Sequence, residues 1–208
     1  MPAKLPKTYK DEPVLPFASQ AEWRRWLEEN HASHDALWIC YAKKSAGIPS
    51  VTYAEVIEEA LCFGWIDGQA ASLSETHYLQ RYTPRRKRSL WSRINRTKAE
   101  ALIASGRMQP SGLREIEAAR ADGRWENAYA SSTVIEVPDI LRLALDSSPA
   151  AAKAFAGLDS RNRYAILYRL THAKREETRQ RLLVQFIAML EEGRTIHPPA
   201  TRRKPAVE

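Results

Sequence analysis

The sequence has few cysteines and no long apolar run. Two cysteines in 208 residues cannot build a disulfide framework. No apolar stretch approaches the roughly 18 residues that a membrane-spanning helix needs, which argues against a transmembrane protein. The first sixteen residues carry charge and proline around no apolar centre, unlike a secretory signal. The sequence therefore predicts a cytoplasmic protein.

The familiar catalytic and metal-binding motifs are also missing. GxGxxG, GxxxxGK, HExxH and GxSxG do not occur. His31 and His34 are three residues apart, but no acidic or cysteine partner follows at the spacing of a metal ligand. Cys40 and Cys62 lie in apolar stretches, where a free cysteine behaves as a small hydrophobe. We therefore expect no metal and no cofactor.

Charge is the one unusual feature of the composition. Lys and Arg number 32 against 25 acids, a net charge of +7. Between residues 76 and 99 there is no acid, and subtracting the eight bases found there from +7 leaves −1 for the rest of the chain. These bases are Arg81, Arg85, Arg86, Lys87, Arg88, Arg93, Arg96 and Lys98. Such a local excess favours an anionic partner, either nucleic acid, a phosphorylated metabolite or an anionic lipid headgroup, although a solvated basic loop is the simpler alternative.

Local patterns in the first part of the chain predict an α+β domain over residues 17–133, after an extended, proline-rich arm over residues 1–16. The apolar run 36–42 is typical of a strand buried on both faces. Runs at 65–73 and 77–83 indicate a β-hairpin that ends at Pro84. Helices are expected to begin at the N-cap residues Ser19, Thr52 and Ser89 and to cover residues 111–122.

Beyond Val134 the sequence predicts helices alone. Two short helices are expected over 138–146 and 150–155, a longer one from Ser160, and a last one that carries Leu182 to Leu190 and stops at Gly193. Residues 134–194 should therefore form a helical module, and the basic, proline-rich residues 195–208 a disordered tail. The expected fold class is α+β: an N-terminal unit with a small sheet and several helices, followed by a helical C-terminal module.

The stretch YTPRRKRSLWSRIN at residues 82–95 is the strongest candidate site. If Ser89 caps a helix, the free N–H groups of its first turn and the arginines before it point to one place, which favours an anion. The alternative is that Ser89 only caps, Trp91 belongs to the core and the arginines are solvated. The candidate ligand-binding residues here are Arg85 and Arg86 as clamps, Trp91 as a stacking surface, and Ser89, Ser92 and Asn95 as hydrogen-bonding groups.

Two further motifs supply the remaining candidates. In Trp65-Ile66-Asp67-Gly68 a carboxylate lies between bulky apolar residues, so it needs a partner if it is buried. A structural pair between Asp67 and an arginine is favoured over a role as general acid or base. Lys174 and Arg179 lie in Ala173–Arg179, between two expected helices, and either face a ligand or form local charge pairs.

The chain carries GWIDG at 64–68, the stretch at 82–95, GRM at 106–108 with Gly112, DGRW at 122–125 and AKREETR at 173–179. In this order and spacing, from about Trp23 to Gly193, these motifs resemble the YdeI/OmpD-associated family, whose members are also labelled bacteriocin-protection proteins. The resemblance implies a bacterial protein with an α+β N-terminal part, a helical C-terminal part and a role in envelope or bacteriocin stress, and it brings no reaction, substrate or cofactor. The positions that match the family's motifs are Trp65, Asp67, Arg85, Arg86, Ser89, Trp91, Ser92, Asn95, Lys174 and Arg179.

Two functional hypotheses follow. The first is a non-enzymatic, stress-related protein that binds nucleic acid or a phosphorylated molecule through the basic stretch. The second is an enzyme that acts on a small phosphorylated or carboxylated substrate, with Asp67 as acid or base and the arginines neutralising the substrate. A protein partner that docks on the helical module is a third possibility.

Overall fold

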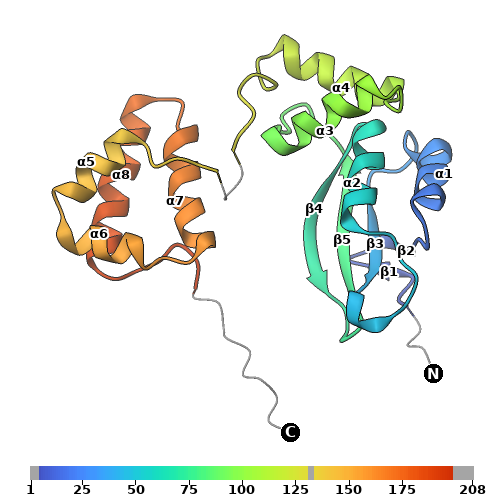
Figure 1. The fold of residues 1–208 in the computed structure, drawn as a ribbon, viewed down its shortest axis with the longest axis horizontal. Coiled ribbons are helices and arrows are strands. Elements are labelled where there is room, and N and C mark those ends of the chain that lie inside the picture. Colours follow the sequence, from blue (N-terminus) through green and yellow to red (C-terminus); the bar gives the residue numbers. More distant parts are fainter. Residues whose placement is uncertain (1–4, 131–133, 199–208) are drawn as a thin grey trace, which may run out of the picture. The chain divides into compact units, whose positions relative to one another are not determined.

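The computed structural model describes residues 5–130 and 134–198. The chain divides into two compact units between Tyr129 and Ala130, close to the expected boundary at residue 134. The first unit holds a five-stranded sheet and four α-helices, and the second holds four more helices within the described residues (Figure 1), which confirms the α+β class. The elements are β1 Thr8–Tyr9, β2 Glu12–Pro16, α1 Gln20–Asn30, β3 Leu37–Ala42, α2 Tyr53–Cys62, β4 Trp65–Ser72, β5 His77–Pro84, α3 Arg93–Ala104, α4 Pro110–Ala121, α5 Asp139–Asp146, α6 Pro149–Ala156, α7 Ser160–His172 and α8 Glu176–Glu191, with a 3₁₀ turn at Lys44–Ala46.

The sheet has the strand order β1-β2-β3-β5-β4. β2 runs parallel to β3, with Val14 opposite Trp38, and the other neighbouring pairs are antiparallel. The residues expected to form an extended arm thus contribute two strands, and residues 1–4 of that arm lie outside the described part. These strands are short and contain Pro13 and Pro16, so their sequence lacks the alternation that identifies a strand.

Strand β3 is the centre of the unit and is buried along both faces, as its sequence predicts. Leu37 and Ile39 face the helices, while Trp38 and Cys40 point to the opposite face, where they pack with Val14. The predicted hairpin forms next to β3, with β5 paired to both β3 and β4.

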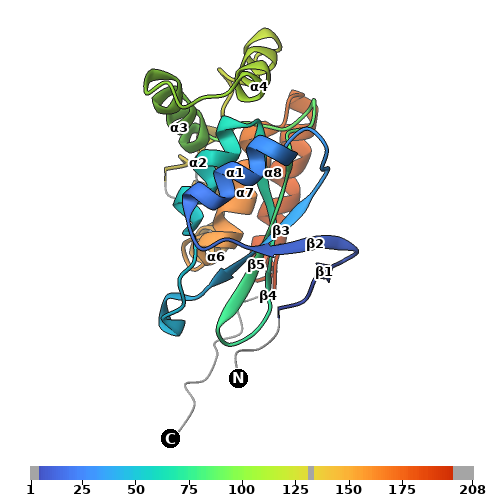
Figure 2. The ribbon, with the colours of Figure 1, turned by 90° about the vertical axis from the view of Figure 1, so that its right-hand side faces the viewer.

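Helices α1 and α2 cover one face of the sheet (Figure 2). The hydroxyl of Thr52 accepts from Glu55 N, and the Glu55 carboxylate accepts from Thr52 N, so the predicted capping box is present at α2. At α1 the Ser19 hydroxyl accepts from Glu22 N, but the Glu22 carboxylate accepts from the N–H of the residue before Ser19. Both predicted helix starts are confirmed.

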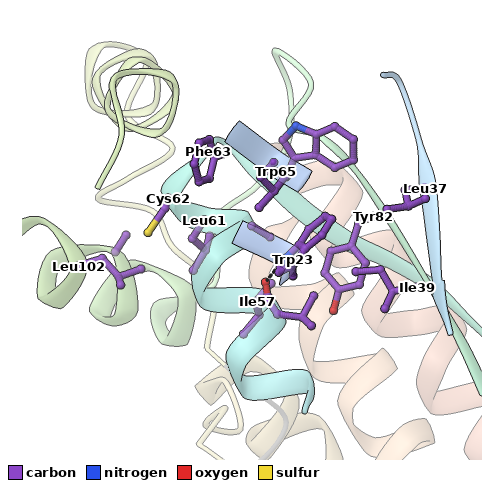
Figure 3. Close-up of a cluster of buried hydrophobic side chains, with 14 of the residues drawn as sticks. Trp23, Leu37, Ile39, Ile57, Leu61, Cys62, Phe63, Trp65, Tyr82 and Leu102 are labelled. Atoms are coloured by element: carbon purple, nitrogen blue, oxygen red, sulfur yellow. Dashed lines mark hydrogen bonds between the residues drawn. The ribbon is translucent and has the colours of Figure 1, made fainter. Parts of the chain in front are cut away.

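Aromatic side chains from three elements meet in the core of the first unit (Figure 3). Trp23 on α1 packs edge-on against Trp65 and tilted against Tyr82, and its indole N–H donates to Val56 O at 3.1 Å. All three rings are at most 1% exposed. A large apolar side chain contributes about 1.5–3 kcal/mol when it is buried, so this cluster is a major source of the unit's stability.

A glycine sets the distance between α4 and α2. A Cβ atom on Gly112 would lie 2.3 Å from Cys62 O and 2.7 Å from Leu61 O, which are backbone atoms at the end of α2. Only a residue without a side chain therefore allows this close approach. The contact fixes α4, and with it Glu115, beside the turn between α2 and β4.

The second unit packs α5, α6, α7 and α8 around a core that includes Leu141, Phe155, Ile166 and Phe186. No helix in the described ranges 5–130 and 134–198 is both long enough and apolar enough to cross a membrane. Of the expected disordered tail, residues 199–208 lie outside the described part. Residues 195–198 are described, and they lie against α7.

Candidate functional site

The segment between β5 and α3 is the centre of the candidate site. Arg85 N donates to Gly64 O at 2.8 Å, which ties the end of the hairpin to the turn after α2. The hydroxyl of Ser89 accepts from Arg86 N at 2.9 Å, and Ser89 N donates back to Arg86 O at 2.8 Å. These two bonds close an exposed turn that carries Arg86, Lys87 and Arg88.

The expectation that Ser89 is the N-cap of α3 is wrong. The helix begins at Arg93, and the hydroxyl of Ser92 caps it by accepting from Asn95 N at 3.1 Å. Residues 91–93 are held extended by a bridge to Tyr129, which donates its N–H to Trp91 O and accepts at its carbonyl from Arg93 N. Two N–H groups at the start of α3, those of Arg93 and Asn95, therefore already have partners within the protein.

Arg85 is buried, with only 6% of its surface exposed. Its guanidinium lies over the ring of Trp91 at 3.6 Å, and Nη1 donates to Leu90 O at 3.2 Å. The other two nitrogen atoms, Nε and Nη2, are buried and have no hydrogen-bond partner in the described part of the chain. Nε and Nη2 form the side-on fork of a guanidinium, the edge that binds a carboxylate or phosphate through two parallel bonds.

Burial lowers the pKa of Arg85 to about 10, because the charged guanidinium has lost water without gaining a paired anion. The carboxylates of Glu115 and Asp67 act against this shift from a distance. Neither forms an ion pair with Arg85 within 4 Å among the described residues. Arg85 therefore remains protonated near neutral pH, as a buried cation that has no ion-paired carboxylate among the described residues.

Asp67 lies opposite Tyr82 in the hairpin. Its carboxylate accepts from the Tyr53 hydroxyl at 3.1 Å, and burial together with the charge of Asp67 raises the pKa of Tyr53. The ion pair expected between Asp67 and an arginine does not form in the described structure, because a tyrosine is the partner of this carboxylate.

The tryptophans among the candidates are core residues. Trp65 is 1% exposed, and its indole N–H donates to His31 O at 3.1 Å. Trp91 is also 1% exposed and packs edge-on against Trp125 at 4.8 Å. Since the guanidinium of Arg85 covers its ring, Trp91 orients Arg85 in this structure.

The eight bases of the acid-free stretch do not form one cluster. Arg81 forms a bidentate pair with Glu12, Arg96 pairs with Glu100, and Lys98 lies 3.7 Å from Glu58. Arg93 donates to Ala128 O at 3.4 Å. That leaves Arg85 buried and Arg86, Lys87 and Arg88 exposed, with no acid in ion-pair distance in the described residues.

Two of the candidate residues, Lys174 and Arg179, lie in the second unit, whereas Arg85 lies in the first. Arg179 forms an ion pair with Glu176 at 2.7 Å and donates to Ala173 O at 3.1 Å. Lys174 is exposed. For Arg179 the alternative of a local charge pair is the one observed.

Sequence reasoning missed two residues that shape the site. Arg124 donates to Ser89 O at 2.8 Å and to the Asp122 carboxylate, so it braces the turn over residues 86–89 from the far side. Glu115 is close enough to Arg85 to affect its pKa. The DGRW motif drew attention to residues 122–125, but nothing in its spacing shows that it meets residue 89. In the described residues no three His, Cys, Asp or Glu side chains gather as metal ligands.

Each of the two parts of the chain matches a protein-family model. Residues 15–115 match a domain of unknown function, DUF8412, and residues 134–193 match the family described as Bacteriocin-protection, YdeI or OmpD-Associated. Of the five motifs that resemble this family, AKREETR lies inside the second match. Searches of curated proteins and of solved structures found no match. The predicted resemblance to the YdeI/OmpD-associated family is thus confirmed for residues 134–193.

Proposed function

We propose that the first unit binds an anionic ligand, with a phosphate or carboxylate group seated on the Nε–Nη2 fork of Arg85. The observation that carries this proposal is a buried guanidinium whose bidentate edge has no partner. A buried charge is costly unless it is paired, so a sequence that keeps Arg85 here without an internal carboxylate favours an external one.

The orientation of the side chain supports this proposal. Leu90 O accepts from Nη1 of Arg85, and the ring of Trp91 fixes the plane of the guanidinium. The orientation of the Nε–Nη2 edge is therefore set by the fold. Such preorganisation favours binding, because the ligand does not have to pay the entropy of ordering the side chain. The exposed Arg86, Lys87 and Arg88 add a positive field at the same turn and attract an approaching anion.

The two free nitrogen atoms are covered by protein, so the ligand reaches them through movement of the turn over residues 86–90. Few hydrogen bonds hold this turn: those between Arg86 and Ser89, the one from Arg85 to Leu90 O, and the one from Arg124 to Ser89 O. Local opening of a short exposed turn costs much less than global unfolding. In this proposal the turn is the entrance to the site.

In this proposal the ligand is a phosphorylated molecule or a nucleic acid, and the protein acts as a binder and not as an enzyme. The cytoplasmic location and the link to stress stay predictions from the sequence and from the family description. The salt response separates the two ligand classes. A polymer held by the exposed bases loses affinity with a log–log slope of about −0.7 to −0.9 for each phosphate neutralised, whereas a small anion held on a buried fork is screened much less.

The test compares Arg85→Lys with Arg114→Gln, a control at an exposed position on α4. Binding of inorganic phosphate, a sugar phosphate, citrate and a short single-stranded oligonucleotide is measured by calorimetry at low and high salt. Arg85→Lys keeps the charge but loses the fork, so we expect a loss of about 10- to 100-fold in affinity for the probe that binds. The proposal fails if Arg85→Lys binds that probe as tightly as the unmodified protein.

Glu115 offers a second check, because its carboxylate has a larger effect on the pKa of Arg85 than that of Asp67. If the fork is reserved for an external anion, Glu115→Gln removes a repelling charge and tightens binding. If Glu115 is the natural partner of Arg85, the same change also lowers the free energy of unfolding, because it leaves the buried guanidinium without its carboxylate.

An enzymatic function is the alternative, and the contact between Tyr53 and Asp67 is the observation in its favour. Asp67 is close enough to Arg85 to affect its pKa, and the charge of Arg85 would neutralise a carboxylated or phosphorylated substrate. In this case Asp67 acts as acid or base, and Asp67→Asn abolishes turnover while binding is kept. Full activity in that variant rules out the catalytic role.

A further inference from the structure

A groove of about 460 Å³ lies on helix α7 in the second unit. The residues that line it recur every three or four positions along the helix, so they share one face. The opposite face carries Ile166 and Leu170, which are buried in the core. The lining residues are Ser160, Arg161, Tyr164, Ala165, Tyr168, Arg169 and His197.

Two arginines lie at the ends of this groove. Arg161 and Arg169 are eight residues apart, which corresponds to about 12 Å along a helix. Both are exposed, and neither forms an ion pair with an acid in the described residues. The lining contains no carboxylate, so the groove favours an anion.

Aromatic rings lie between the two arginines. The rings of Tyr164 and Tyr168 are 5.6 Å apart and tilted by 45°. Ala165 lies beside them, and its small side chain leaves the space above the helix open. Burial raises the pKa of Tyr168, whose ring also stacks on His172 with the ring centroids 4.1 Å apart.

The remaining wall is held in place by a buried side chain. Asn162 is 2% exposed, accepts from His197 N at 2.8 Å and donates to His197 O at 3.2 Å. Its amide also donates to Asp159 Oδ1, the N-cap of α7, which fixes its orientation. His197 is therefore fixed at the edge of the groove by the fold itself, so the site is built before any ligand arrives.

We propose that this groove binds a small anion with a planar aromatic ring, of the chemistry of a nucleoside monophosphate. The ring packs on Tyr164 and Tyr168, and the phosphate pairs with Arg161 or Arg169. The volume is in the usual range for small-molecule sites, about 300–1,000 Å³, and the arginines limit the site to about one nucleotide in length. This proposal does not depend on the one made for Arg85.

The first experiment titrates the full chain with adenosine 5′-monophosphate, adenosine and ribose 5-phosphate by calorimetry. We expect the monophosphate to bind about tenfold or more tightly than either of the others, because only it offers both ring and charge. Equal binding of the monophosphate and ribose 5-phosphate overturns the proposal, as does the absence of binding. A single-stranded oligonucleotide whose affinity rises steadily with length also overturns it, because the ligand is then a polymer.

Variants then locate the site. Arg161→Gln with Arg169→Gln, and separately Tyr168→Ala, should each weaken binding of the monophosphate about tenfold, while Tyr168→Phe keeps the ring and most of the affinity. Arg181→Gln, at an exposed position on α8, is the matched control and should bind normally. Arg85→Lys should also bind the monophosphate normally, so failure of one site is distinguished from failure of the other. If the arginine pair and Tyr168→Ala both retain full affinity, the groove is not the site.

Discussion

The guanidinium of Arg85 stacks on the ring of Trp91 at 3.6 Å, yet two of its three nitrogen atoms are buried without a partner. A second buried charged residue in the same unit, Glu59, does have partners. Glu59 is 2% exposed and is paired with both Arg24 and Arg107. The buried charge of Glu59 is thus paired, whereas two nitrogen atoms of the buried Arg85 guanidinium have no partner. Arg85 therefore lowers the free energy of unfolding of the ligand-free protein relative to an apolar residue.

Replacing Arg85 with Met should therefore not destabilise the ligand-free protein. Methionine has a similar length and no charge, so the change removes an unpaired buried cation at the loss of one hydrogen bond and the stacking on Trp91. We expect the free energy of unfolding to stay the same or to rise by about 1 kcal/mol while anion binding is lost. Urea denaturation followed by circular dichroism measures the first, and calorimetry the second. A fall of 3 kcal/mol or more, roughly the loss for a broken buried pair, would show that Arg85 has a structural partner.

A pair of serine variants tests where α3 begins. Ser92→Ala removes the N-cap and should lower the free energy of unfolding of the first unit by about 1 kcal/mol. Ser89→Ala loses only a bond within an exposed turn, so its effect should stay below about 0.5 kcal/mol. Denaturant midpoints of the two variants, measured side by side, decide the matter. The reverse order would restore Ser89 as the N-cap.

The tyrosines of the core predict sensitivity to alkali. Tyr41 and Tyr82 share a hydrogen bond of 2.8 Å, and burial raises the pKa of both hydroxyls above the ordinary value near 10. The unfolded chain releases these protons near pH 10 and the folded chain keeps them, so the unfolded state binds fewer protons above that pH. The free energy of unfolding should therefore be constant below about pH 9 and fall as pH rises past about 10.

Arg85 acts in the opposite direction, because its lowered pKa adds stability as pH rises from about 10. Its single proton is outweighed by the two tyrosines. Tyrosinate absorbance followed together with circular dichroism gives the check. Ionisation of all eight tyrosines while the circular dichroism stays native would contradict the prediction.

Gly112→Ala should destabilise the first unit by about 2–3 kcal/mol, since the added methyl group meets the backbone carbonyls of α2 and these cannot move aside. Gly157→Ala is the matched control. A Cβ atom there meets its neighbours only at 3.6 Å, and the backbone has an ordinary negative φ of −84°. Thermal unfolding should show a loss for the first variant and little change for the second. Equal stability of the two variants would mean that α4 can shift away from α2.

The sequence predicts the frame of this molecule well and its candidate site less well. The run 36–42, the capping box at Thr52 and Glu55, and the glycine-terminated helices depend on neighbours in the chain, so local reasoning finds them. The sequence predicts the start of α3 at Ser89 and not at Ser92, because residues 91–93 are held extended by Tyr129. Tyr129 lies 37 residues beyond Ser92, outside the reach of local reasoning. The burial of Arg85 likewise depends on Trp91 and on contacts between distant segments, which composition and spacing do not contain.

All six tryptophans of the chain lie in the first unit, at residues 23, 26, 38, 65, 91 and 125, and the second unit has tyrosine as its only strong chromophore. Tryptophan fluorescence therefore comes from the first unit alone. An anion that reaches Arg85 touches the side chain stacked on Trp91 and should change that emission, whereas a ligand on α7 has no tryptophan within its own unit. A fluorescence titration thus follows the surroundings of the unit that holds Arg85 before any variant is made.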